Sequence, residues 1–393
     1  MKRIIKYIPS LIYVMVMGGM LIKKDFFLMG GIFLMLPVVY EFIKYVFTNE
    51  GPLNIETPDG SNQPYHPSVL FFENKWNGYN YWMAYTPFPI GGVPYRDRWE
   101  YPCICVSNDG IEWTGIGDNN PLDDLNKIQI KDKDYFSDTH LVFNQEKNRI
   151  ECYYRLSEEK YFHNNEKGVW LFRRYSYDGI SWSDREIAIS PCNDKLDENE
   201  LPRISPSIIK EENYKMWYVI SKNQKYTIYN SKSKDGVEWS KGTPCYLENK
   251  EINPWHIDCQ HYNGIYYLLT YDFSQKLILW QSKDGINFKY IKCILTASHK
   301  IGSFYKMTLY RSCIVQDSRS DSDGYKVYFS AGNDRKVKIG LMGGKSLNCL
   351  LVKNVRNKLS IIDFVIDYLR KYFFVEIWIL WRIKRRINER KRK

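Results

Sequence analysis

Strand-length runs of apolar and β-branched residues recur throughout residues 62–352, and turn-forming residues separate them. Four of the runs are followed by one motif, Ser-x-Asp-Gly-(Ile/Val)-x-(Trp/Phe), which begins at Ser107, Ser176, Ser233 and Ser282. Asp-Gly between apolar strands is typical of a tight hairpin, because glycine accepts the positive φ that such turns need. Successive motifs are 69, 57 and 49 residues apart, so one structural unit is repeated with loops of different length.

Two more strand-like runs precede each motif, and a fifth unit follows the last motif. The expected first and second strands of the units are 68–73 and 79–85, 139–143 and 150–156, 206–210 and 214–220, 257–262 and 265–271, and 309–315 and 325–330. The fifth unit continues with a strand over 337–341, and Gly343-Gly344 takes the place of its Asp-Gly turn. Five units of four strands predict an all-β fold, a five-bladed β-propeller.

Both ends of the chain have the hydropathy pattern of membrane elements. Apolar runs over 8–22 and 26–40 predict a transmembrane-type helical hairpin, although each run is shorter than the roughly 20 residues that a straight span needs. A helical hairpin buried in a soluble protein is the alternative. Residues 361–383 predict an amphipathic helix with Trp378 and Trp381 as interface anchors. The polybasic residues 384–393 then suit an anionic membrane surface, and a solvated tail is the alternative.

The net charge of +11 is located at these two ends. Residues 1–50 carry +3 and residues 353–393 carry +9, which leaves −1 for residues 51–352. The sequence therefore predicts three parts: a membrane-anchoring helical hairpin over 1–50, the propeller over 51–352, and a basic amphipathic helix and tail over 353–393. A near-neutral body excludes a basic nucleic-acid groove across it.

The same charges predict the side of the membrane. A tail this basic is expected to stay in the cytoplasm, and a hairpin of two spans returns the chain to the side where it began. We therefore expect the propeller on the cytoplasmic side of a membrane. A single effective span would instead place the propeller outside.

The first strand of each propeller blade lines the central channel, so the leading ends of these strands predict the site. Alternate residues of a strand share a face, which pairs Asp138 with His140 and His256 with Asp258. Three of the six histidines occupy matching positions in three different units. The residues expected at the channel mouth are His66, Asp138, His140, Arg203, Ser205, His256, Asp258, Tyr310 and Arg311.

Two long loops between second and third strands are expected to wall the channel mouth. The loop over 86–102 carries Glu100 among charged and aromatic residues, and the loop over 157–168 carries Glu158, Glu159 and His163. The third and fourth units have tight turns at this position. Aromatic rings beside carboxylates, imidazoles and guanidinium groups suit a sugar, which stacks on rings and hydrogen-bonds to polar groups.

With these features the sequence resembles the five-bladed propeller glycoside hydrolases of families 43, 32, 68 and 130, over about residues 62–352. The resemblance is carried by the five-unit pattern, the opening His66-Pro67-Ser68 where that group often has Asp-Pro, and the acid Asp138 in the second unit. It implies a pair of carboxyl groups that flank a glycosidic bond. The chain departs from the group at His66, and at Ser205-Pro206-Ser207, where the group has Glu-Gly-Pro.

Three hypotheses follow for the function. In the first, the chain is a glycoside hydrolase-like or glycan-modifying enzyme at a membrane, which acts on a surface polysaccharide or glycolipid through Asp138 and Asp258 as catalytic residues. Its substrate-binding residues are then His66, Glu100, His140, Arg155, His256 and Arg311. In the second, the three imidazoles and two carboxylates of the channel hold a metal ion. In the third, the propeller binds or assembles glycans without catalysis.

Other enzyme classes find no support in the sequence. It contains no Gly-x-Ser-x-Gly and no glycine-rich strand-to-helix turn, which disfavours an α/β-hydrolase, a kinase or an ATPase. We therefore expect no cofactor and assign no residue as a metal ligand. Only the second hypothesis adds a structural cation in the propeller channel.

Overall fold

The computed structural model describes most of the propeller region and short parts of the ends. The described residues are 36–43, 51–90, 100–117, 122, 135–157, 169–190, 200–223, 225–248, 252–298, 303–319, 324–333, 336–353, 355, 364–365 and 368–369. The chain divides into two units, of which one holds 51–298 and 304–357 and the other holds 1–50, 299–303 and 358–393. The first unit contains the candidate site.

Five antiparallel blades make up this unit. Blade one is β1 (Pro64–Trp76), β2 (Tyr79–Pro87), β3 (Cys103–Ser107) and β4 (Thr114–Gly115); blade two is β5 (Tyr135–Asn144), β6 (Arg149–Ser157), β7 (Val169–Ser176) and β8 (Glu186–Ile189); blade three is β9 (Glu200–Lys210), β10 (Tyr214–Lys222), β11 (Lys225–Ser233) and β12 (Thr243–Pro244); blade four is β14 (Pro254–Tyr262), β15 (Ile265–Asp272), β16 (Lys276–Ser282) and β17 (Asn287–Thr296); blade five is β18 (Thr308–Gln316), β19 (Tyr325–Gly332), β20 (Val337–Gly344) and β21 (Leu351–Val352). The predicted five-bladed propeller is confirmed.

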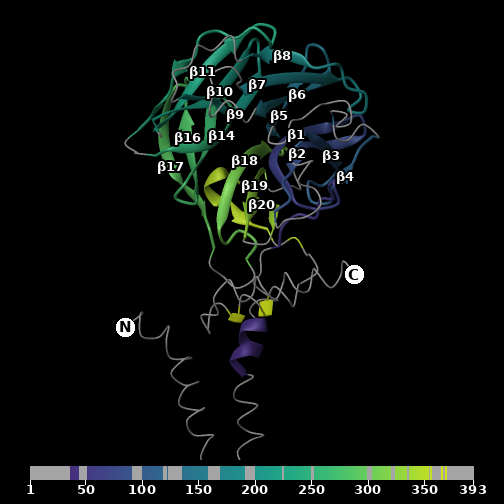
Figure 1. The fold of residues 1–393 in the computed structure, drawn as a ribbon, viewed down its shortest axis with the longest axis vertical. Coiled ribbons are helices and arrows are strands. Elements are labelled where there is room, and N and C mark those ends of the chain that lie inside the picture. The colour runs from purple at the N-terminus through teal and green to yellow at the C-terminus, as the bar shows by residue number, and fades with distance from the viewer. Residues whose placement is uncertain are drawn as a thin grey trace, which may run out of the picture. The chain divides into compact units, whose positions relative to one another are not determined.

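The innermost strands form a closed ring. Strand β1 packs against β5, β5 against β9, β9 against β14, β14 against β18, and β18 against β1 (Figure 1). The segment before β1 is also bound to blade five, because the backbone N–H of Leu53 donates to the carbonyl of Ile339 in β20 at 2.8 Å. Each innermost strand therefore has a neighbouring blade on either side, and the leading ends of all five strands surround one axis.

Two details differ from the sequence prediction. Blade four has a fifth strand, β13 (Tyr246–Leu247), which pairs in parallel with Asn287 and Phe288 of β17. Gly343 and Gly344 are not a turn, because they pair with Lys326 and Tyr325 inside the β19–β20 ladder. The turn of blade five follows them and contains the 3-10 helix η5 (Leu347–Cys349).

The repeated motif builds a turn that satisfies its own backbone. In the third copy, Asp235 accepts hydrogen bonds from the backbone N–H groups of Val237 and Glu238 at 2.8 and 2.9 Å, and from the Ser233 hydroxyl at 3.0 Å. Gly236 has a φ of +80°, a conformation that favours glycine. The backbone donors in this turn are therefore bound by the motif's own side chains, which explains why the motif recurs.

The motif also docks each blade on the preceding one. The indole of Trp217 in blade three donates to the carbonyl of Gly285 in blade four at 2.7 Å. The Tyr328 hydroxyl of blade five donates in the same way to the carbonyl of Gly110 in blade one at 3.0 Å. The sequence repeat therefore encodes contacts between blades as well as hairpins within them.

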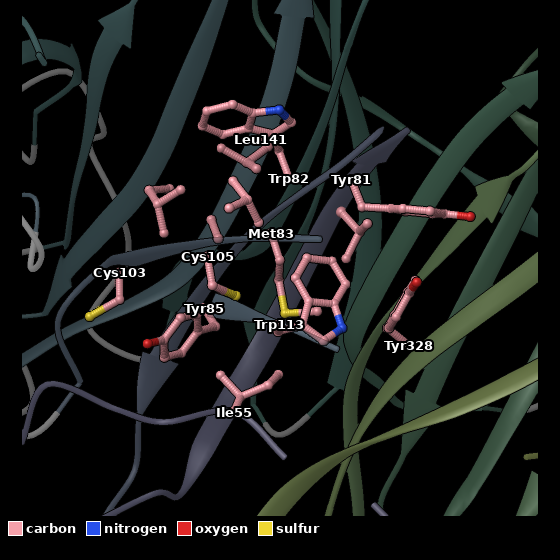
Figure 2. Close-up of a cluster of buried hydrophobic side chains, with 14 of the residues drawn as sticks. Ile55, Tyr81, Trp82, Met83, Tyr85, Cys103, Cys105, Trp113, Leu141 and Tyr328 are labelled. Atoms are coloured by element: carbon pink, nitrogen blue, oxygen red, sulfur yellow. The ribbon is translucent and has the colours of Figure 1, made fainter. Parts of the chain in front are cut away.

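The hydrophobic core lies between neighbouring blades. Figure 2 shows part of the largest cluster, in which Trp82, Met83 and Tyr85 of β2 lie beside Cys103 and Cys105 of β3. Trp82 and Met83 are fully buried. Similar clusters join blades two and three, three and four, and four and five. Burying such side chains is worth about 1.5–3 kcal/mol each, so every boundary between blades stabilises the ring.

The second unit is described only in part. Phe364 packs against Val38, Phe42 and Tyr368 within it, and the rings of Phe42 and Phe364 are 5.1 Å apart. Among the residues that the structure describes, none belongs to a helix with the length and apolar character that a membrane crossing requires. Most of the predicted hairpin and of the predicted amphipathic helix and tail lies outside the described residues.

Candidate functional site

A bulge interrupts each innermost strand near its leading end. The pairing register shifts between Tyr65 and Ser68 in β1 and between Ser137 and His140 in β5. His66, Asp138 and Ser205 stand at these bulges in blades one to three with φ of 53, 53 and 54°, a conformation that ordinary residues avoid. Bulges and such strained residues concentrate at functional sites because they redirect side chains.

The bulges bring His66, Asp138 and His256 together from three blades. One ligand-type atom from each side chain lies within 4.8 Å of the others. The Nδ1 of His256 is 3.5 Å from Oδ1 of Asp138, and the two imidazole rings are 5.7 Å apart. All three residues are at most 3% exposed. We call these three residues the His–Asp–His cluster.

The carboxylate of Asp138 is held by fixed donors on one side. Its Oδ2 accepts hydrogen bonds from the guanidinium of Arg155 and from the backbone N–H of Ser205 at 3.0 Å. Arg311 lies 3.5 Å from Oδ1, which has no hydrogen-bond partner among the described residues. Burial alone would raise the pKa of Asp138, but the guanidinium groups of Arg155 and Arg311 outweigh it and hold that pKa far below its usual range. Asp138 is therefore ionised.

Both imidazoles of the cluster are neutral. Burial lowers the pKa of His66 to about 4 and lowers that of His256 well below its usual value, despite the opposing charge of Asp138. The Nδ1 of His66 lies 2.8 Å from the Thr86 hydroxyl, which fixes the ring. Neither ring nitrogen of His256 has a hydrogen-bond partner among the described residues. A buried imidazole without partners is rare in a folded protein and marks this position as a candidate ligand site.

Glu100 reaches the cluster from the loop between β2 and β3. Its Oε1 is 3.5 Å from Nδ1 of His66, and the residue is buried. Burial, followed by the charge of Asp138, raises the pKa of Glu100 well above its usual value. The site therefore contains one carboxyl group whose pKa is lowered and one whose pKa is raised.

His140 and Asp258 lie in a second layer of side chains and not in the cluster. The Nε2 of His140 is 2.8 Å from the carbonyl of Ile208, and burial lowers the pKa of His140 to about 3. Asp258 accepts hydrogen bonds from the backbone N–H of Ile314 at 2.9 Å and from Gln260 at 3.1 Å. Both side chains thus bind neighbouring strands and link one blade to the next.

The structure places the predicted residues in two groups. The cluster and its surroundings contain His66, Asp138, His256, Glu100, Arg155 and Arg311, and the second layer contains His140 and Asp258. The side chains of Arg203, Glu158, Glu159 and His163 lie outside the described part of the chain. Two residues that the sequence did not single out are Thr86, beside the His66 ring, and Ser330, whose hydroxyl accepts from the His66 backbone N–H at 2.9 Å. Neither carried a sequence signal, because each acts through a contact between distant segments.

Comparison with known proteins gives one match among curated sequences at significant similarity. The chain is 25% identical over 329 residues to the A type blood N-acetyl-alpha-D-galactosamine deacetylase of Flavonifractor plautii, with 70% of this chain and 41% of that protein aligned. The chain thus spans less than half the length of this relative. No family model matches the chain.

Solved structures show the same architecture. An N-acetylgalactosamine deacetylase from F. plautii, in complex with blood group B trisaccharide, superimposes with a TM-score of 0.62 at 23% identity, covering 75% of this chain and 94% of that one. The GH43_1 enzyme of Xanthomonas citri superimposes at 0.54 with 7% identity, covering 82% and 99%. A thermostable family-43 glycoside hydrolase gives 0.52 at 13% identity, covering 80% and 99%. The chain therefore has a five-bladed propeller fold with family-43-like structural neighbours, and its relative in sequence is a carbohydrate-active enzyme.

Proposed function

We propose that this chain is a metal-dependent hydrolase that removes the acetyl group from an N-acetylated sugar of a glycan. The observation that carries the proposal is the His–Asp–His cluster, in which two neutral imidazoles and one ionised carboxylate converge inside the propeller mouth. The name of the sequence relative, a deacetylase of N-acetylgalactosamine, supports the same reaction class.

The residues of the cluster fit a divalent cation. Two imidazoles and a carboxylate are the ligand set of many catalytic metal sites, and the imidazoles must be neutral to bind, as burial makes them here. Oδ1 of Asp138 and both ring nitrogens of His256 are buried without hydrogen-bond partners among the described residues, and a cation would bind this Oδ1 and one of the two nitrogens. His66, Asp138 and His256 would hold the ion, which would polarise the amide carbonyl and lower the pKa of the attacking water.

The surrounding residues have distinct roles in this reaction. Arg155 and the Ser205 backbone fix Oδ2 of Asp138, so that Oδ1 is left to face His256 and the proposed ion. Amide hydrolysis adds water to the carbonyl carbon and breaks its bond to nitrogen, and the departing amine needs a proton. The raised pKa of Glu100 favours its protonated form, and the residue adjoins His66, which suits a general acid for that step. In this proposal Asp258 is a structural residue that joins blade four to blade five.

Glycoside hydrolysis is the second candidate. Its specific support is that the environments of Glu100 and Asp138 move their pKa values in opposite directions, which is the arrangement of an acid and a carboxylate partner. This assignment keeps the predicted role of Asp138 but replaces Asp258 with Glu100. The two candidates differ in their need for a metal ion.

The location of the chain is a further part of the proposal. The apolar runs over 8–22 and 26–40 and the basic residues 384–393 support attachment to a membrane, with the propeller in the cytoplasm and a surface glycan or glycolipid as substrate. A cysteine-accessibility assay in intact cells tests this location. Labelling of a cysteine in the propeller by an impermeant reagent would show that the propeller is outside.

One experiment separates the candidate functions. The purified full chain is loaded with Zn²⁺ or Mn²⁺ and incubated with N-acetylated oligosaccharides, and released acetate and released sugar are measured with and without a chelator. Acetate release that the chelator abolishes is expected. Sugar release that survives the chelator would favour glycoside hydrolysis, and glycan binding without either product would favour a non-catalytic binding protein.

A further inference from the structure

Three aromatic side chains from neighbouring blades form one contiguous surface beside the cluster. Tyr226 stands near the start of β11, Trp255 on β14, and Phe273 in the turn between β15 and β16. The Trp255 ring is 5.4 Å from that of Tyr226 and 5.5 Å from that of Phe273, and Tyr226 and Phe273 are 5.8 Å apart. Each ring thus contacts the other two. We call these three residues the aromatic shelf.

The shelf is continuous with the His–Asp–His cluster. Trp255 directly precedes His256, and its indole N–H donates to the Tyr310 hydroxyl at 2.9 Å. The Tyr310 ring packs 4.0 Å from the His256 ring. The ring of buried Tyr271 also joins the two groups, since it is 6.3 Å from the ring of Phe273 and 6.4 Å from that of His256. An unbroken set of ring contacts therefore runs from a candidate metal ligand to the outer end of the shelf.

The outer end of the shelf is open to solvent. Phe273 is 56% exposed, although a buried phenylalanine would gain about 1.5–3 kcal/mol. It stands in a tight turn, where Gly, Asn, Asp and Ser are the residues that the backbone favours, so turn geometry does not explain it. Trp255 and Tyr226 are half-buried, and exposed Asn253 and Ser274 place polar groups at the edges. Exposed rings with a polar rim beside a site are typical of a ligand surface.

We propose that the aromatic shelf is a subsite for a pyranose ring next to the sugar that occupies the cluster. The apolar C–H face of a pyranose stacks on aromatic rings, and its hydroxyl groups reach polar groups at their edge. The substrate is then an oligosaccharide or polysaccharide that extends over blades three and four. A single N-acetylated sugar at the cluster would leave the aromatic shelf empty. This inference rests on the proposed function for the identity of the first sugar.

The test compares oligosaccharide with monosaccharide binding by the full chain. Isothermal titration calorimetry is performed with N-acetylglucosamine, N-acetylgalactosamine and their β-linked di- and trisaccharides. We expect Phe273→Ala to weaken oligosaccharide binding at least about tenfold, which corresponds to about 1.4 kcal/mol, and to leave monosaccharide binding within about twofold. Phe273→Trp should restore the affinity.

The control is Tyr246→Ala, which removes an aromatic side chain of similar exposure, 59%, from β13 at the other edge of the blade-four sheet. It should change neither affinity. Equal affinities for wild type and Phe273→Ala, equal loss of monosaccharide and oligosaccharide binding, or no oligosaccharide binding by the wild type would each overturn the inference.

The same titrations in the presence of a chelator separate this inference from the proposed function. Stacking on the shelf does not need the metal ion, so the difference between wild type and Phe273→Ala should persist without it. A persistent difference in a protein that releases no acetate would refute the deacetylase proposal and leave the shelf supported. Loss of the difference on chelation would overturn the shelf as an independent subsite.

Discussion

The carboxylate of Asp138 in blade two accepts a hydrogen bond from the backbone N–H of Ser205 in blade three, 3.0 Å from Oδ2. Both residues have positive φ, so two bulged strands must keep their strained conformations for this contact to form. Because Arg155 binds the same oxygen, Oδ1 is left to face His256 and Arg311. The orientation of the candidate ligand oxygen is thus set by the junction between two blades.

The first prediction concerns this oxygen. Asp138→Asn removes the negative charge and keeps the shape. We expect affinity for Zn²⁺ or Mn²⁺ to fall by about 100-fold or more, since loss of a group that only orients a metal ligand already costs about 10–100-fold. Isothermal titration calorimetry of the metal-free protein measures the affinity. Asp184→Asn is the matched control, because it makes the same change at an exposed side chain between β7 and β8, outside the cluster, and should leave the metal affinity unchanged. Equal metal affinity in Asp138→Asn and wild type would contradict the proposed site.

Sequence patterns predicted the five blades and the three residues that come together in the cluster, but not which of the other candidate residues lie outside it. Four Asp-Gly motifs and a fifth set of strand-like runs predicted the five units, and the leading ends of the first strands predicted His66, Asp138 and His256. Alternation along a strand paired Asp138 with His140, but the bulge between Ser137 and His140 breaks the two-residue period and separates them. A bulge depends on contacts with the next blade, such as that between Asp138 and Ser205, and these contacts join residues that are distant in sequence.

The second prediction tests the structural role of Asp258. Asp258→Ala leaves the buried N–H of Ile314 without its acceptor, so we expect the free energy of unfolding to fall by about 1–3 kcal/mol. Asp258→Asn keeps an oxygen for that N–H and should cost less. Urea unfolding measures both variants, and metal affinity should stay at the wild-type value. Loss of enzymatic activity in Asp258→Asn without loss of stability would instead support the catalytic role expected from the sequence.

The third prediction concerns the docking of the Asp-Gly turns. A Cβ at Gly179 in blade two would overlap ring atoms of Trp82 in blade one, and φ there is +79°. Gly179→Ala therefore combines strain of about 1–2 kcal/mol with overpacking of about 1–3 kcal/mol.

Gly78→Ala is the matched control for this variant. Gly78 has a φ of +90°, and a Cβ there would meet no atom within 4 Å. It should lose only the conformational part of the free energy of unfolding, and urea titration of both variants measures the difference. Equal losses would show that the contact with Trp82 does not constrain the turn.

The fourth prediction concerns acid stability at the boundary between blades five and one. Asp317, after β18, accepts hydrogen bonds from Lys326 at 2.7 Å, from Arg319 at 2.8 Å and from the Tyr81 hydroxyl of blade one. Burial opposes ionisation of Asp317, but its hydrogen bonds with Arg319, Lys326 and Tyr81 hold the pKa well below its usual value. Asp317→Asn leaves two buried or half-buried cations without their partner, so we expect a loss of about 3 kcal/mol at pH 7.

The stabilisation that ionised Asp317 provides should weaken in acid. A carboxyl group whose pKa is lower in the folded state stabilises the fold above its unfolded pKa, about 3.9, and that stabilisation is lost as the pH falls further. The difference in unfolding free energy between wild type and Asp317→Asn should therefore shrink between pH 5 and pH 3, as measured by urea titration at each pH. The control is Glu212→Gln, which changes an exposed side chain and should have the unfolding free energy of wild type at each pH. A difference that stays constant down to pH 3 would show that ionised Asp317 does not join these two blades.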